Sequence, residues 1–143
     1  MHTFTDPDLW RKLSAEALGT AFLVIGVVGS GIMAETLSNG SIALALLANA
    51  IATGCILYVI ITVLGPISGA HFNPAVTLAF YLRKEISRNV AVGFALMQIS
   101  GAIAGVWLTH LIFELPVFQL ASTARTGVSQ WVSEGSRRSV CCL

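Results

Sequence analysis

Polar residues interrupt a strongly apolar sequence at 68–77, which reads Ser-Gly-Ala-His-Phe-Asn-Pro-Ala-Val-Thr. Asn73 followed by Pro74 is typical of a helix start, because Asn is a favoured N-cap residue and Pro at the first helical position loses no hydrogen bond. The residues that follow reach only Tyr81 before basic residues begin, whereas a bilayer crossing needs about 20 residues. The stretch therefore predicts a half-helix preceded by non-helical backbone.

The chemistry that this stretch offers is that of a pathway and not only of a membrane anchor. Non-helical backbone is tolerated at membrane depth only where it is buried in protein or lines a watery cavity. Elsewhere the sequence contains no nucleophile and base pair, no paired carboxylates, no metal-ligand cluster and no phosphate loop. We therefore expect no enzyme activity, no cofactor and no metal.

The composition sets the class of protein that must position this stretch. The chain has 143 residues, of which 55% are hydrophobic and only 10% are charged, too apolar for an ordinary soluble domain and long enough for about three membrane crossings. No Asp, Glu, Lys, Arg or His occurs from Thr36 to Ala70. The few basic residues are scattered, so we expect no nucleic-acid partner. We predict an all-α membrane protein with the lipid bilayer as its surroundings.

The expected elements are three transmembrane helices and one re-entrant segment. Gly65-Pro66 is expected to end the second helix, because Pro disfavours helix in the residue before it. The cytoplasmic N-terminus covers 1–12, the membrane spans cover about 13–34, 42–64 and 89–113, and the re-entrant loop and half-helix cover 65–82. An extracytoplasmic loop and a truncated or frame-shifted tail cover 114–143.

The distribution of basic residues predicts the orientation in the membrane. Five fall on one side of the predicted spans, whereas Arg125, Arg137 and Arg138 lie well beyond the last span. Cytoplasmic segments near spans carry an excess of Lys and Arg, so the N-terminus is predicted to be cytoplasmic. The compact N-terminus and short loops favour a bacterial inner membrane. The five are Arg11, Lys12, Arg83, Lys84 and Arg88.

Two polar residues within the spans have two interpretations each. Glu16 either snorkels to the interface or is a buried acceptor for another segment's backbone donors or a His. Gln98 either makes a hydrogen bond between segments or is a ligand in the pore. Gly101 and Gly105 form a Gly-x-x-x-Gly pair, which is typical of close helix packing in lipid.

Three patterns, in the same order along the chain, resemble the major intrinsic protein family of aquaporins and glycerol facilitators. The polar stretch resembles that family's first Asn-Pro-Ala signature, and Ala15-Glu16 with Gly19-Thr20 resembles its first-helix pattern. Gln98-x-x-Gly101-Ala102 resembles its third-helix signature. The resemblance implies one inverted-repeat half of the aquaporin-like fold, with three crossings and one half-helix.

The resemblance also implies roles for individual residues. Asn73 would donate its side-chain amide to a passing oxygen, and the positive end of the half-helix would oppose cations. Glu16 and Gln98 would support the loop, while Pro74 and Ala75 would pack against a second copy of the motif. His71 either contributes to the path or supports the loop with no solute contact. The backbone carbonyls that would line the path belong to Gly69, Ala70, His71 and Phe72.

Thr53 lies twenty positions before Asn73, where the family has a residue of its selectivity constriction. Water-selective members usually carry an aromatic residue or His there. The smaller Thr favours a wider opening that admits glycerol or other small uncharged solutes.

The chain contains only the first of the two halves that a family pore requires. The sequence at Trp131–Glu134 is similar to that at Lys12–Glu16, and the residues after Glu134 are too polar for a membrane span. We therefore expect a truncation or frameshift after Glu134. The predicted function is a passive channel for water or small uncharged solutes, as a half-pore. The alternative is a non-conducting membrane fragment or interaction partner, and homo-oligomerisation stays open.

Overall fold

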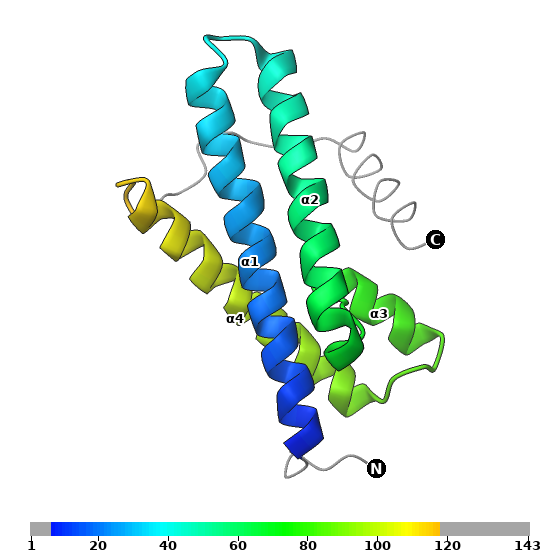
Figure 1. Cartoon of the computed structure of the whole chain (residues 1–143). Helices are drawn as coiled ribbons and strands as arrows, with labels where there is room; N and C mark the ends of the chain where they lie inside the picture. The colour runs from blue at the N-terminus through cyan, green and yellow to red at the C-terminus, as the bar shows by residue number, and fades with distance from the viewer. Residues whose placement is uncertain (1–6, 118–143) are drawn as a thin grey trace, which may run out of the picture.

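The computed structural model describes residues 7–117, and within this range the regular structure is entirely helical. Three of the helices are long and apolar enough to cross a membrane, while the fourth is a nine-residue half-helix. The predicted fold class is thereby confirmed. The elements in chain order are α1 (Pro7–Leu37), α2 (Ile42–Ser68), α3 (Pro74–Leu82) and α4 (Arg88–Ile112) (Figure 1).

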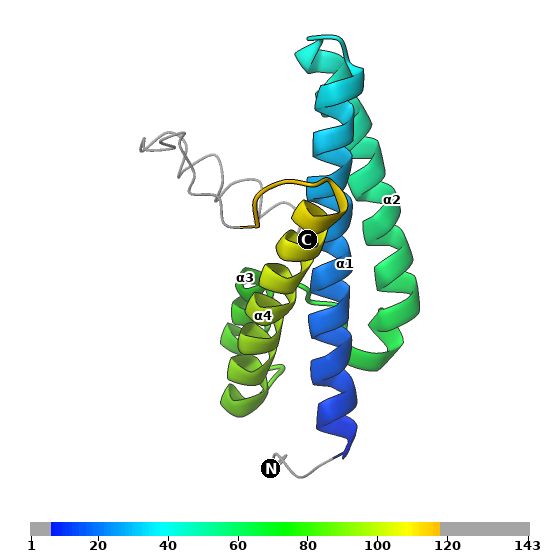
Figure 2. The same cartoon turned by 90° about the vertical axis from the view of Figure 1, so that its left-hand side faces the viewer.

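Helix α1 lies between the other two long helices and packs against both. Figure 2 shows α2 on one side of α1 and α4 on the other, with α3 beside α4. The α1–α2 connection closes one end of the bundle, which we call the hairpin end (Figure 1). The start of α1 and the α3–α4 connection lie at the opposite end, which we call the N-terminal end.

Helix α1 begins at Pro7, earlier than the span predicted from Leu13. The carboxylate of Asp8 lies 3.5 Å from the Arg11 guanidinium and 3.4 Å from the Lys12 ammonium, one turn further along. Such pairs support exposed helical turns by a few tenths of a kcal/mol, roughly 0.3–0.5 each, so the helix extends beyond its apolar part.

Helix α2 does not end at Gly65-Pro66 but continues to Ser68, so the predicted end at Leu64 is wrong. Pro66 removes one backbone donor but does not by itself supply a helix end. The end comes at Gly69, whose φ of 94° is left-handed and whose N–H donates to the Gly65 carbonyl at 2.9 Å. Gly is the residue that adopts this C-terminal capping conformation most readily.

Helices α1 and α4 approach closely through the predicted Gly-x-x-x-Gly pair. A Cβ at Gly101 would lie 2.3 Å from the Ala17 carbonyl oxygen, and one at Gly105 would lie 2.7 Å from the Ala21 carbonyl oxygen. Only the absence of a side chain permits these backbone contacts. This crossing brings α4 against the segment of α1 that contains Glu16.

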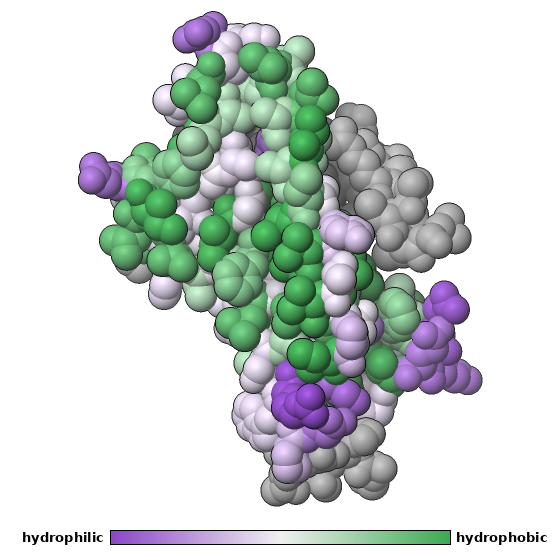
Figure 3. Space-filling model, viewed as in Figure 1, coloured by the Kyte–Doolittle hydropathy of each residue, from purple (hydrophilic) through white to green (hydrophobic). Residues whose placement is uncertain are grey.

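Apolar side chains cover most of the face in Figure 3, and hydrophilic residues gather toward the ends of the helices. Ile60 is the one residue of α2 that is buried. The outer surface of α2 therefore faces lipid or another membrane segment. The start of α1 and the α3–α4 connection share the N-terminal end (Figure 1), so the five basic residues used to predict the orientation lie at one end. The orientation itself stays a prediction, and the predictions for 118–143 lie outside the described residues.

Candidate functional site

The loop between α2 and α3 has an unusual backbone. Gly69 is left-handed, but Ala70 and Phe72 also have positive φ values, of 55° and 46°. Non-Gly residues adopt this region at a cost of order 1–3 kcal/mol each, and they keep it only where surrounding contacts enforce it. The loop therefore needs a strong support.

Glu16 of α1 provides that support. Its side chain is fully buried, with 0% exposure. Oε1 accepts hydrogen bonds from the Ser68 hydroxyl at 2.6 Å and the His71 N–H at 3.0 Å. Oε2 accepts from the Phe72 N–H at 2.7 Å and from Gln98 Nε2 at 2.7 Å. In the structure, Glu16 is therefore a buried acceptor of backbone N–H groups, and its side chain does not snorkel to the membrane interface.

A second set of hydrogen bonds holds Gln98 and His71. Gln98 Nε2 also donates to Thr77 Oγ1 at 2.9 Å, and His71 Nδ1 lies 3.1 Å from the same hydroxyl oxygen. The His71 ring stacks on Phe80 with 4.4 Å between ring centroids and meets Phe94 edge-on at 5.4 Å. Gln98 therefore bonds between segments, and Glu16 supports the loop through the His71 backbone and not through its ring.

Phe72 is held by its side chain as well as by its backbone. Its ring lies directly over Gly19, where a Cβ would come within 2.0 Å of the ring. Gly19 is three residues after Glu16, so the two lie one turn apart on one face of α1. The carboxylate thus holds the loop backbone while the glycine makes room for the ring.

These contacts leave one set of polar groups without partners. The backbone carbonyls of residues 69–72 accept no hydrogen bond within residues 7–117. Asn73 has an extended backbone, and its Oδ1 accepts from the Ala75 N–H at 2.8 Å, which confirms the predicted N-cap. Its Nδ2 has no partner within the described range. The loop therefore offers four acceptors followed by one donor, and these can replace the hydration of a small polar solute.

The remaining predicted site residues are placed but not joined to this network. Thr53 is half-buried in the middle of α2 and makes no side-chain hydrogen bond to the described part of the loop. Pro74 and Ala75 are exposed at the start of α3. Sequence reasoning missed the roles of Ser68 and Thr77 in the network. Their one signal was a hydroxyl residue next to an apolar run.

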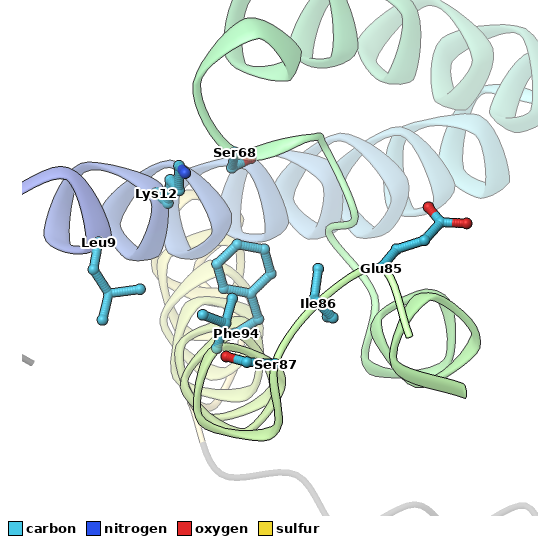
Figure 4. A pocket seen from close by; sticks show the side chains of 8 residues that line it. Leu9, Lys12, Ser68, Glu85, Ile86, Ser87 and Phe94 are labelled. Atoms are coloured by element: carbon cyan, nitrogen blue, oxygen red, sulfur yellow. The ribbon is translucent and has the colours of Figure 1, made fainter. Parts of the chain in front are cut away.

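A pocket of about 210 Å³ opens near this support at the N-terminal end of the bundle (Figure 4). Ser68, whose hydroxyl donates to Glu16, is one of its lining residues. Ser68 therefore links the wall of this pocket to the Glu16 carboxylate that holds the loop. Its wall also includes Leu9, Lys12, Glu85, Ile86, Ser87 and Phe94.

The fold has three long apolar helices and one half-helix, and a buried carboxylate holds the loop that leads into the half-helix. These features define a helical membrane protein with a re-entrant segment. Residues 3–140 match the family model described as "Major intrinsic protein". The chain belongs to the major intrinsic protein family.

Several relatives support this assignment. The chain is 55% identical over 128 residues to "Aquaglyceroporin AqpS" of Rhizobium meliloti, covering 90% of this chain and 54% of that protein. It is 35% identical over 102 residues to "Aquaporin Z" of Brucella melitensis (71% and 44%). It is 33% identical over 110 residues to "Lens fiber major intrinsic protein" of Gallus gallus (77% and 40%). The chain thus spans about half the length of the curated relatives that it matches.

Proposed function

We propose that this chain supplies one half of a passive membrane channel for water and small uncharged solutes such as glycerol. The observation that carries the proposal is the loop at 69–73. Its N–H groups at His71 and Phe72 are bonded to Glu16, whereas four successive carbonyls and the Asn73 amide nitrogen have no partner within residues 7–117. A strained backbone held in this way presents acceptors to a solute instead of to its own helix.

The same geometry supports passage of neutral solutes. Carbonyl acceptors and the Asn73 donor replace the hydrogen bonds that a solute gives up on leaving water. The start of α3 carries the positive end of the half-helix dipole, which opposes cations. Asn73 would orient a water so that a continuous proton wire is broken.

Thr53 supports a solute range that includes glycerol. A Thr at the family's constriction position leaves more room than an aromatic residue or His. The relative that matches 90% of this chain is named an aquaglyceroporin, which agrees with the wider opening. We therefore propose glycerol as a solute beside water.

The path requires a second half of inverted topology. Pro74 and Ala75 are exposed at the start of the half-helix, which leaves them free to pack against the corresponding residues of such a half. The broad apolar surface of α2 is also open to a neighbouring segment. We place the assembly in a bacterial inner membrane with the N-terminus in the cytoplasm.

Stopped-flow light scattering of proteoliposomes tests this proposal. The chain is reconstituted alone, and with a separately expressed second half of the Rhizobium aquaglyceroporin, and each sample is challenged with osmotic gradients of a non-permeant solute and of glycerol. In the sample that contains both halves, we expect permeabilities above those of empty vesicles and of either half alone. The absence of any rise in both preparations, with inserted and folded protein, would falsify the channel function.

The second candidate is a membrane segment that binds a partner without conducting. The observation that favours it is the surface of α2, of which Ile60 is the one buried residue and which is therefore open to a partner segment. This candidate predicts a stable complex with the second half and no permeability increase. Co-purification is expected for both candidates, so the permeability of the co-purified complex separates them.

A further inference from the structure

Asn49 is a polar residue in the outer part of α2, near the hairpin end of the bundle. Its Oδ1 accepts a hydrogen bond from the Ser30 hydroxyl of α1 at 2.7 Å. This bond joins the two helices and fixes the plane of the Asn49 amide. The amide nitrogen must then point away from Ser30.

The amide nitrogen of Asn49 has no hydrogen-bond partner within residues 7–117. It faces Gly31, where even an added Cβ would stay 3.8 Å from Nδ2. A donor left unpaired in a membrane helix is costly unless water or a solute satisfies it.

Asn49 lines a pocket of about 470 Å³ between the hairpin ends of α1 and α2. Glu35 lines the same pocket from α1, Ser38 lines it from the α1–α2 connection, and Ile42 and Leu46 line it from α2. The Glu35 side chain is exposed and makes no ion pair or hydrogen bond within the described range. The pocket thus combines an open amide donor, an open carboxylate acceptor and an apolar wall.

We propose that Asn49 and Glu35 form a binding site for small polyhydroxyl solutes at the mouth of the path. A hydroxyl oxygen accepts from Asn49 Nδ2, and a hydroxyl hydrogen donates to the Glu35 carboxylate, while the carbon chain lies on Ile42 and Leu46. Water can also make these hydrogen bonds, but a polyol makes them and in addition covers the apolar wall. The site therefore favours polyols over water.

This site rests on the proposed channel and adds to it a residue that determines specificity. Asn49 is four residues before Thr53, so the two lie one turn apart along the same side of α2. A polyol held at Asn49 is already partly desolvated one turn before the constriction. The polyol therefore exchanges its hydrogen bonds to water in two steps, first at Asn49 and then at the constriction.

Three variants in the conducting preparation test the site. Asn49→Leu removes the donor, and we expect the ratio of glycerol to water permeability to fall about fivefold, the equivalent of one net hydrogen bond of about 1 kcal/mol. Ser30→Ala removes the bond between the helices and the 3.4 Å bond from the Ser30 hydroxyl to the Val27 carbonyl, but it leaves the Asn49 donor in place and should change the ratio by less than about twofold. Thr62→Val is the matched control, because its exposed hydroxyl bonds only the Tyr58 carbonyl of its own helix. If Asn49 only joins helices, Ser30→Ala and Asn49→Leu will lower the ratio equally, and the proposal is overturned.

A binding measurement decides the question even where the chain does not conduct. The chain is labelled with ¹⁵N-asparagine in nanodiscs and titrated with glycerol. We expect a saturable shift of the Asn49 side-chain amide that Glu35→Leu abolishes, while Asn89, at the opposite end of the bundle, stays unshifted. The lack of a saturable Asn49 shift overturns this site and leaves the channel proposal standing. A saturable shift without permeability refutes the channel alone.

Discussion

Replacing Glu16 by Gln tests the support of the loop with almost no change of shape. The carboxylate accepts four hydrogen bonds, two at each oxygen. A Gln side chain keeps one acceptor oxygen and presents an NH₂ group to the other pair of donors. If Gln98 turned its own amide to accept from this NH₂ group, it would lose its 2.9 Å bond to Thr77.

The size of the effect follows from the two donors that lose their acceptor. A buried donor left unsatisfied costs about 1–3 kcal/mol, so Glu16→Gln should destabilise the fold by about 2–6 kcal/mol. A typical domain is stable by about 5–15 kcal/mol, so this is a large share. Titration with SDS in mixed micelles, followed by circular dichroism, measures the loss.

Amide hydrogen exchange locates the effect. We expect faster exchange at His71 or Phe72 in Glu16→Gln, because one of these N–H groups loses its acceptor. Glu114→Gln is the matched control, since the Glu114 side chain is exposed and makes no ion pair or side-chain hydrogen bond within residues 7–117. A destabilisation below about 1 kcal/mol, with unchanged exchange at both amides, would refute the proposed support.

Three further substitutions give distinct results in the same SDS titration. Gly101→Leu forces a side chain against the Ala17 backbone and should cost about 1–3 kcal/mol or separate α1 from α4. Gly69→Ala places a Cβ on a residue with φ of 94° and should cost about 1–2 kcal/mol. Thr77→Val removes the hydroxyl that lies between His71 and Gln98, and should cost about 1–3 kcal/mol and change the ¹⁵N shift of His71 Nδ1.

Each of these has a control in the same structural setting. Ser100→Leu adds the same side chain one residue earlier, at an exposed position of α4, and should be neutral. Gly54→Ala lies in α2 with open space around it and should stabilise by about 0.5–1 kcal/mol. Thr62→Val removes an exposed hydroxyl from α2. Equal effects in a variant and its control would show that the specific contact is not responsible.

Much of the fold could be predicted from local sequence. Long apolar runs and the Asn73-Pro74 pair fixed the number of long helices and the start of α3, because these depend on nearby residues alone. The end of α2 was not predicted correctly. Because Pro66 disfavours helix in the residue before it, the sequence predicts that α2 ends at Leu64, whereas the left-handed turn at Gly69 supplies the actual end.

The candidate site was predictable in its members but not in its bonds. Glu16 and Gln98 stood out because polar residues are costly in membrane helices. Their partners lie far away in sequence: the Phe72 N–H is 56 positions from Glu16, and Gln98 is 82 positions from it. Ser68 and Thr77 carry no comparable signal, because hydroxyl residues commonly bond to their own helix.

The water and glycerol permeabilities of Asn73→Asp show whether the Asn73 amide nitrogen takes part in conduction. Asp keeps the oxygen that caps α3 through the Ala75 N–H but removes the Nδ2 donor that the path is proposed to use. In proteoliposomes that contain the chain and a complementary half, we expect both permeabilities to fall about tenfold, because losing the hydrogen bond from Nδ2 costs about 1.4 kcal/mol. Permeabilities equal to those of the unsubstituted chain, at equal insertion and folding, would contradict this expectation.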